Sequence, residues 1–235
     1  MRTLILSLLA ASATWAASDT LPTTRGDLKI TPVTHGSVVL EFGGKSWYID
    51  PWSSGDFSSL PKADVILITD IHGDHMDPKA IAAVSKDSTV IVAPPSVAKT
   101  VSGARVIENG GKLNLHGVAV EAVPMYNLQR GPEPGKLFHD KGRGNGYVLT
   151  LGGKRVYFSG DTEGVPEMRA LENIDVAFVC MNLPYTMPPD EAAAAVKAFQ
   201  PKIVYPYHYR GSDLSIFENA LKSDPGIEVR LREWY

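Results

Sequence analysis

The stretch that decides the fold is Asp70–His75, with the sequence DIHGDH, which follows the apolar run Val65–Ile68 after Thr69. The apolar run is typical of a short buried strand, and the polar stretch falls where that strand ends. Four of its six side chains are carboxylates or imidazoles, a combination that suits zinc, iron or manganese. Asp77 and Pro78 then predict the start of a helix, as its cap and its first-turn residue. A solvated polar turn is the alternative, but the density of ligand side chains favours a metal site.

This stretch resembles the H-x-H-x-D-H signature of the metallo-β-lactamase superfamily, with Asp70 in place of the usual first histidine. The resemblance spans about residues 28–210 and implies an α/β fold, the four-layer αββα sandwich, with two metals at one edge. The H-x-S, D-P and G-D-T elements at His35, Asp50 and Asp161 are most similar to those of small stand-alone hydrolases that include the ascorbate-6-phosphate lactonase-like proteins.

Strand-like and helix-like segments alternate along the chain, as in a layered α/β protein. We expect strands at 28–33, 38–42, 46–49, 65–68, 90–93, 146–151, 155–158, 176–180 and 202–206, two more within 112–123, and helices at 78–85, 95–101, 165–171, 189–199 and 213–222. Two hairpins carry G-G-K at the turn, at Gly43–Lys45 and Gly152–Lys154, which indicates two similar halves. The irregular segment 127–145 is long enough to predict a functional loop.

The chain length of 235 residues suits one domain. The first residues, Met1–Ala10, combine an arginine with a short apolar run, and small residues follow up to Ala17. This pattern predicts a signal peptide over residues 1–17 and a single domain over 18–235, in a periplasmic or secreted protein. No later stretch is long and apolar enough to span a bilayer, so we expect no membrane association once the signal is removed.

The net charge of −3 and the lack of a basic cluster argue against a nucleic-acid partner. Cys180 is the only cysteine, so no intramolecular disulfide can form, and its apolar surroundings predict a buried thiol. The expected partner is a small-molecule substrate. The sequence leaves the oligomeric state open.

The resemblance implies a second metal position with a complete ligand set. Its members are Asp74, His75, Asp161 and His208. Two imidazoles and two carboxylates hold a divalent ion with one position open for water. The alternatives are that Asp161 caps a helix and that His208 packs in the core.

The first metal position has fewer matching ligands. Asp70 and His72 fit two of its places, and Asp161 would bridge both metals. The superfamily expects a further histidine where this chain has Asn127. Either the amide oxygen of Asn127 or the imidazole of His139, from the long loop, would replace it; hydrogen bonding within the loop is the alternative for both.

Five further residues are expected around the metals. The resemblance places His35 beside the pocket and assigns Asp50 to orienting ligand imidazoles. Tyr126, Tyr185 and Arg210 are expected in the pocket walls.

The substitution at Asp70 changes the charge of the expected site. Three carboxylates would cancel the charge of two divalent ions and a hydroxide, and would raise the pKa of the bound water. The added oxygen donor also shifts the preference from zinc toward iron or manganese. We therefore expect a tightly held metal in the second position and a weak or partly filled first one.

These features predict an exported metal-dependent hydrolase that uses a metal-activated water on an ester, lactone, amide or phosphodiester, with Asp74 positioning the water. The expected cofactor is Zn²⁺, as one or two ions, with Mn²⁺ or Fe as other candidates. Two alternatives remain: a metal-binding protein with a degenerate first site and little or no turnover, and an iron-dependent redox protein.

Overall fold

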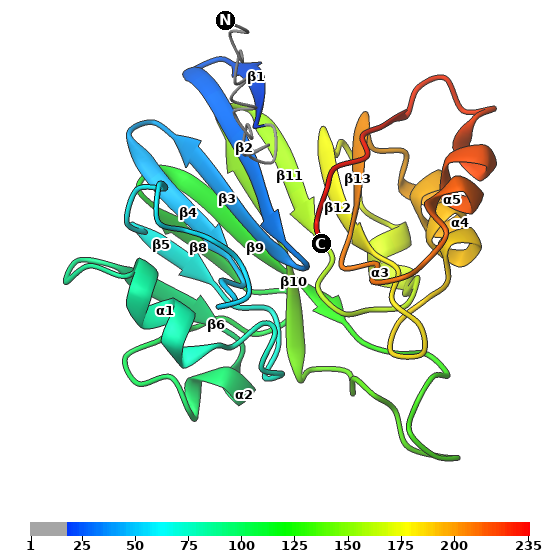
Figure 1. Cartoon of the computed structure of the whole chain (residues 1–235), viewed down its shortest axis with the longest axis horizontal. Coiled ribbons are helices and arrows are strands. Elements are labelled where there is room, and N and C mark those ends of the chain that lie inside the picture. The colour runs from blue at the N-terminus through cyan, green and yellow to red at the C-terminus, as the bar shows by residue number, and fades with distance from the viewer. Residues whose placement is uncertain (1–17) are drawn as a thin grey trace, which may run out of the picture.

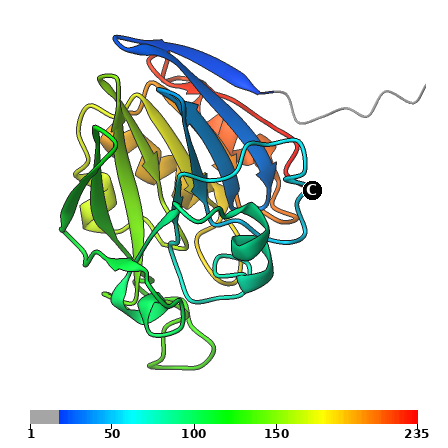
Figure 2. The ribbon, with the colours of Figure 1, turned by 90° about the vertical axis from the view of Figure 1, so that its left-hand side faces the viewer.

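The computed structural model of the chain describes residues 18–235, and the expected signal peptide at 1–17 lies outside the described residues. Two seven-stranded sheets face each other, with strand orders β1 to β7 and β14 to β8. Helices α1 and α2 cover the outer face of the first sheet, and α3, α4 and α5 cover the second (Figure 1). Figure 2 looks onto the sandwich from the side of α1, which lies in front of the sheets. The expected αββα sandwich is confirmed.

The elements have the following bounds. The first sheet contains β1 (Asp19–Thr23), β2 (Gly26–Thr34), β3 (Ser37–Phe42), β4 (Lys45–Ile49), β5 (Val65–Leu67), β6 (Val90–Ala93) and β7 (Arg105–Val106). The second contains β8 (Lys112–Leu115), β9 (Val118–Met125), β10 (Gly144–Leu151), β11 (Lys154–Phe158), β12 (Val176–Cys180), β13 (Ile203–Tyr207) and β14 (Glu228–Val229). The helices are α1 (Pro78–Val84), α2 (Pro95–Ala98), α3 (Pro166–Arg169), α4 (Pro189–Phe199) and α5 (Leu214–Leu221).

The core follows from the pattern of apolar residues. All five residues of β12 are buried, because this central strand is covered on both faces. In α4 the alanines Ala192, Ala193 and Ala195 are buried, and their small side chains allow close approach of helix and sheet. The helix α1 begins as expected, since the Asp77 side chain accepts hydrogen bonds from the backbone N–H groups of Lys79 and Ala80.

The two halves repeat one topology. The first three pairings in each sheet are antiparallel, and the rest are parallel. In the first half, Asp64 precedes β5 and accepts hydrogen bonds from Lys45 Nζ at 2.9 Å, the Ser46 N–H at 3.0 Å and Lys86 Nζ at 3.0 Å. Lys45 is the lysine of the first G-G-K turn.

The second half repeats this cluster. Asp175 precedes β12 and accepts from Lys154 Nζ at 3.5 Å, the Arg155 N–H at 2.9 Å and Lys202 Nζ at 2.8 Å. Lys154 is the lysine of the second G-G-K turn. The turn motif therefore marks an equivalent carboxylate in each half, which explains the repeat seen in the sequence.

Three strands were not expected from the sequence: β1, β7 and β14. Each lies at or near the edge of a sheet, and the two residues of β7 are exposed. Edge strands carry few apolar residues, so the alternation that reveals a strand is missing. Two expected helices are also shorter than predicted, since α2 ends at Ala98 and α3 at Arg169.

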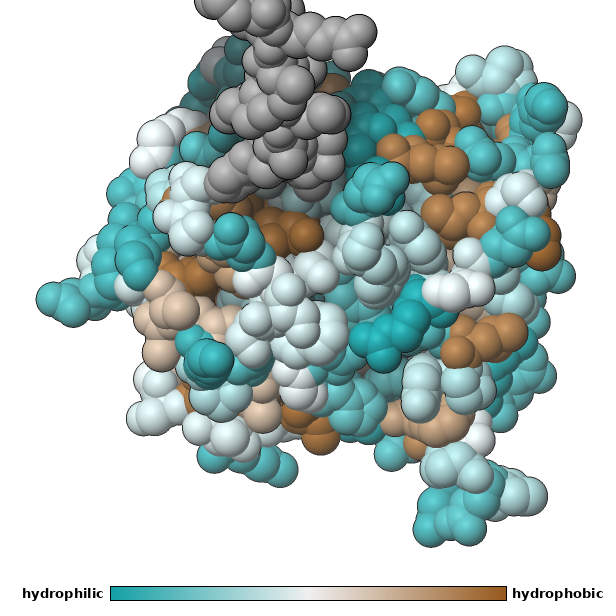
Figure 3. All heavy atoms as spheres, in the orientation of Figure 1, coloured by the Kyte–Doolittle hydropathy of each residue, from teal (hydrophilic) through white to brown (hydrophobic). Residues whose placement is uncertain are grey.

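The segment between β9 and β10 contains no helix or strand, in agreement with the irregular loop expected there. It extends at the lower right of Figure 1 and forms a hydrophilic lobe at the lower right of Figure 3. A backbone hydrogen bond joins two parts of this loop: the Asn127 N–H donates to the His139 carbonyl at 2.9 Å. Among residues 18–235, no helix has the length and apolar character needed to cross a membrane.

Candidate metal centre

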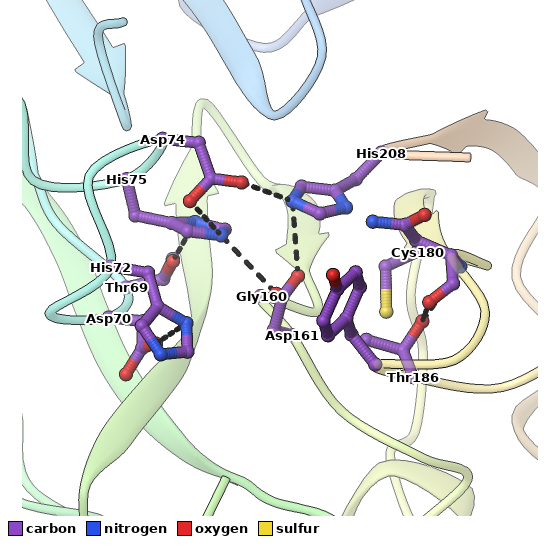
Figure 4. A network of polar contacts seen from close by, with 12 residues as sticks. Thr69, Asp70, His72, Asp74, His75, Gly160, Asp161, Cys180, Thr186 and His208 are labelled. Carbon is purple, nitrogen blue, oxygen red and sulfur yellow. Dashed lines mark hydrogen bonds and ion pairs between the residues drawn. The ribbon is translucent and has the colours of Figure 1, made fainter. Parts of the chain in front are cut away.

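The candidate ligands come from both sheets and meet at one edge of the sandwich. Asp70 to His75 follow β5 of the first sheet, while Asp161 follows β11 and His208 follows β13 of the second. Strands β4 to β6 and β11 to β13 are parallel, so their carboxyl ends lie at a common edge. Figure 4 shows the side chains of Asp74, His75 and His208 converging on Asp161, with Asp70 and His72 on the side of His75.

The second metal position has its four expected residues together. His75 Nε2 lies 3.4 Å from Asp161 Oδ2, and His208 Nε2 lies 3.4 Å from both Asp161 Oδ1 and Asp74 Oδ2. His75 Nε2, His208 Nε2 and Asp161 Oδ1 are buried and have no hydrogen-bond partner. Buried polar atoms are rarely left without partners, so these atoms fit the donor set of a cation.

Asp50 fixes the orientation of the His75 ring through the Nδ1 atom. His75 Nδ1 lies 2.8 Å from Asp50 Oδ2, and the Thr69 N–H donates to Asp50 Oδ1 at 2.7 Å. Burial acts to lower the pKa of His75, but the carboxylates of Asp161 and Asp50 outweigh it and raise the pKa well above its usual value. A position between these two carboxylates therefore favours positive charge.

The first metal position is completed from the long loop. His72 Nδ1 lies 3.0 Å from Asp70 Oδ2, and His139 Nε2 lies 3.4 Å from Asp161 Oδ2 and 3.9 Å from Asp70 Oδ2. His139 is buried, and its Nε2 atom has no hydrogen-bond partner. Of the two candidates for the missing ligand, His139 is the one whose free ring nitrogen faces the carboxylates.

Asn127 supports His139 and does not itself offer an oxygen to a metal. Its Oδ1 atom accepts from the His139 N–H at 2.9 Å and contacts His139 Nδ1 at 2.6 Å. Its Nδ2 atom donates to Glu163 Oε1 at 3.1 Å and to the Tyr185 carbonyl at 2.9 Å. Because both ends of the amide are engaged, the contacts of Asn127 match the alternative of hydrogen bonding within the loop.

Glu163 is a residue that sequence reasoning missed. Its buried carboxylate accepts from the backbone N–H groups of Leu128, Gln129 and Arg130, at 2.9, 3.2 and 3.0 Å. Together with Asn127 it anchors the start of the loop that carries His139. The sequence feature that could have identified Glu163 is its position two residues after Asp161, in the sequence GDTE.

Arg143 was also missed, and it changes the charge of the site. Its guanidinium donates to Asp70 Oδ1 at 3.0 Å and Oδ2 at 2.7 Å, and to the Phe138 carbonyl at 2.7 Å. Burial acts to raise the pKa of Asp70, but the contacts with His72, His75 and Arg143 outweigh it and lower the pKa. The expectation of a neutral site counted three carboxylates without this arginine, whose positive charge offsets that of Asp70.

His35 lies beside the second position. Its Nε2 atom lies 3.0 Å from Asp74 Oδ2, and the ring centroids of His35 and His208 are 3.6 Å apart. Burial lowers the pKa of His35 to about 4, although Asp74 acts in the opposite direction, so the imidazole is neutral at pH 7. Gly36 allows this close packing, since a Cβ there would lie 3.3 Å from His208 Cδ2.

The three expected wall residues differ in their surroundings. The Tyr126 hydroxyl donates to Glu167 at 3.0 Å, so its polar end is engaged away from the ligand cluster. Tyr185 is exposed, with its ring against Phe138. Arg210 is also exposed and follows His208 by two residues.

Comparison with known proteins agrees with this geometry. A family model described as the beta-lactamase superfamily domain matches residues 29–208. The chain belongs to the metallo-β-lactamase superfamily. A UPF0173 metal-dependent hydrolase from Thermococcus kodakarensis is 32% identical over 196 residues, which cover 77% of this chain and 84% of the relative.

Two solved structures also resemble this chain in fold and in sequence. A crystal structure assigned as a metal-dependent hydrolase from Parabacteroides distasonis is 44% identical, with a TM-score of 0.88, and the match covers 94% of this chain and 100% of that one. Igni18, a metallo hydrolase from Ignicoccus hospitalis, is 25% identical, with a TM-score of 0.71 and coverage of 87% and 94%. The chain thus shares its fold and family with proteins named as metal-dependent hydrolases.

Proposed function

We propose that this metallo-β-lactamase superfamily member is an exported hydrolase that uses zinc to cleave an ester, lactone, amide or phosphodiester bond in a small molecule. The observation that carries the proposal is the repeated separation of 3.4 Å between buried imidazole nitrogens without partners and carboxylate oxygens. A hydrogen bond would bring such atoms closer, to about 2.7–3.2 Å. The separation fits a cation between them.

The same distance supports zinc over an octahedral ion. Ligand atoms about 2.0–2.1 Å from a tetrahedral ion lie about 3.3–3.4 Å apart. Neighbouring ligands of an octahedral ion at about 2.1 Å lie about 3.0 Å apart. The second position has three separations of 3.4 Å and one of 3.9 Å, and the first combines 3.0, 3.4 and 3.9 Å. That the second position binds more tightly stays a prediction, and it is supported by Arg143, which donates to both carboxylate oxygens of Asp70 in the first position.

Asp74 is the residue we assign to positioning water. Burial acts to raise its pKa, but His208, His35 and His75 outweigh that effect and hold the pKa well below its usual value, so the side chain is ionised. It is also 30% exposed, unlike the nearly buried side chain of Asp161. An ionised, accessible carboxylate accepts a hydrogen bond from water and orients it toward a substrate. When bound, the metal supplies Lewis acidity and lowers the pKa of water.

Export is the part of the proposal that rests on the sequence alone. The basic start, the apolar run and the small residues of segment 1–17 support a cleaved signal. We therefore assign the mature protein to the periplasm or the extracellular medium.

The decisive test is metal content per chain, measured by mass spectrometry, together with hydrolysis of a panel of esters, lactones, amides and phosphodiesters. We expect one or two zinc ions and turnover in the native protein, and loss of both in His208→Asn. His116→Asn is the matched control, because both histidines have positive φ angles, of 47° and 50°, which asparagine tolerates. His116 is exposed in the turn between β8 and β9, away from the ligands.

Other outcomes would point to the alternatives. Bound zinc without turnover on any substrate class would indicate a metal-binding protein, and bound iron would indicate a redox protein. A native protein that retains no zinc, manganese or iron after each is added would refute the proposal.

A further inference from the structure

We propose that Tyr235 is a positioning residue of the second metal position, because its hydroxyl holds the His35 ring in the orientation that donates a hydrogen bond to Asp74. The proposal rests on the proposed function only in treating Asp74 as a metal ligand. Tyr235 lies 200 residues from His35 in the chain, and nothing in the sequence connects them.

The contacts hold Tyr235 at a defined place. Its Oη atom lies 2.6 Å from His35 Nδ1, and it accepts a hydrogen bond from the Arg210 N–H at 2.9 Å. The preceding residue, Trp234, is buried in the core against Phe178, and its carbonyl accepts from the His35 N–H at 3.1 Å. The segment that carries Tyr235 is therefore anchored at both the side chain and the backbone.

The direction of each hydrogen bond follows from the groups involved. The carboxylate of Asp74 can only accept, so His35 Nε2, at 3.0 Å, must carry the proton. His35 is buried and packed 3.6 Å from the His208 ring, beside a position for a cation, so it is neutral and has a single N–H group. Its Nδ1 atom is then an acceptor.

Tyr235 is the donor that Nδ1 requires. Its oxygen already accepts from Arg210, and burial raises the pKa of Tyr235 to about 12, so the hydroxyl keeps its proton at pH 7. The chain of hydrogen bonds thus runs in one direction, from Tyr235 through His35 to Asp74. It places the carboxylate oxygen Oδ2 where it also faces His208 Nε2, at 3.4 Å.

Loss of the hydroxyl would leave His35 Nδ1 without its donor at 2.6 Å. The ring would then lose the contact that holds its Nε2 atom 3.0 Å from the carboxylate of Asp74. Mutation of a residue that orients a metal ligand in this way typically weakens metal binding 10–100-fold. For Tyr235, which acts through His35, we expect an effect at the low end, about 10-fold.

The test is zinc affinity of Tyr235→Phe, measured by competition with a chromophoric chelator, together with the ¹⁵N shifts of the His35 ring. Tyr209→Phe is the matched control: its ring contacts Tyr235 at 5.1 Å, but its hydroxyl lies 3.4 Å from the Arg232 carbonyl and does not reach His35. We expect about 10-fold weaker zinc binding and a changed ¹⁵N shift of His35 Nδ1 in Tyr235→Phe, with neither change in Tyr209→Phe.

Two results would overturn the proposal: unchanged affinity and an unchanged Nδ1 shift in Tyr235→Phe, or equal losses in both variants, which would mean a general structural role. If the native protein binds no zinc, the proposed function fails, but the ¹⁵N shifts of the metal-free protein still decide whether the Tyr235 hydroxyl donates to His35. The failure of one proposal is thus distinguishable from the failure of the other.

Discussion

Arg143 donates to both carboxylate oxygens of Asp70, at 3.0 and 2.7 Å, at the position where the superfamily usually has a histidine. Asp70 is completely buried. The pair therefore explains how a carboxylate is tolerated there without a metal ion, and it gives the first prediction.

Replacing Arg143 with methionine should destabilise the metal-free protein by about 3 kcal/mol, because it leaves the buried charge of Asp70 unpaired. Zinc should restore part of this loss, since a cation would compensate the same charge. Denaturant unfolding with a chelator and with zinc measures both effects. Arg230→Met is the control, because it removes a similarly buried arginine that pairs with Glu228 and donates to the Tyr205 hydroxyl, away from Asp70. An equal zinc effect in the native protein and Arg143→Met would contradict the prediction.

Replacing Asn127 with alanine should reduce the bound metal from about two ions to one. The change removes the acceptor that holds His139 at 2.6 and 2.9 Å, while the second position draws no ligand from the loop. Metal analysis after dialysis against excess zinc checks this, with His139→Ala expected to give the same result. Gln129→Ala, an exposed loop residue that contacts Glu163 through its backbone N–H, should retain both ions. Two ions in Asn127→Ala would show that the loop holds His139 by other means.

We expect the carboxylate of Asp64 to make the free energy of unfolding depend on pH in the acid range. Burial acts to raise its pKa, but the hydrogen bonds from Lys45, Ser46 and Lys86 outweigh it and lower the pKa to about 2. Since the folded pKa lies below the unfolded value of about 3.9, this contribution is complete above pH 4 and disappears as the pH falls to 2.

The measurement for Asp64 is the unfolding free energy of Asp64→Asn across this pH range. After allowance for solvent screening of the lysines, we expect the variant to be about 1–2 kcal/mol less stable at pH 6 and no less stable at pH 2. Asp175→Asn should show the same sign, because Lys202 and Arg155 also lower the pKa of Asp175 against the effect of burial. A constant difference from pH 6 to pH 2 would contradict this explanation.

Export can be tested by cell fractionation and by determining the first residue of the mature protein. We expect cleavage within residues 13–18, since Asp19 must remain to accept hydrogen bonds from Arg232 at 2.6 and 3.0 Å and from the Tyr205 hydroxyl at 2.8 Å. A chain that starts at Ser18 should stay in the cytoplasm. Detection of the uncleaved protein in the cytoplasm would contradict the prediction.

Much of the fold could be predicted because its central strands and helices are strongly patterned. The strand Val176–Cys180 and the helix Pro189–Phe199 have the expected bounds, since continuous burial or helical spacing marks them. The candidate ligands that closely follow strand ends, such as Asp70 and Asp161, were recognisable for the same reason: a strand end fixes where a side chain lies.

The remaining parts depend on contacts that leave no local pattern. His139 and Arg143 come from an irregular loop, where spacing says nothing about direction, so their partners Asn127 and Asp70 could not be assigned. Tyr235 reaches His35 across 200 residues of sequence. The packing of Trp234 in the core and its backbone contact with His35 bring them together.

The repeated halves have a consequence for assembly. The first sheet supplies Asp70, His72, Asp74 and His75, and the second supplies His139, Asp161 and His208, so neither half alone can hold a metal at either position. Division of the chain at the Asn109–Gly110 bond, between β7 and β8, would give two fragments with one sheet each. Because the ion needs ligands from both, the affinity of the fragments for each other should rise with zinc concentration. The protein would then serve as a zinc-dependent fragment-complementation pair.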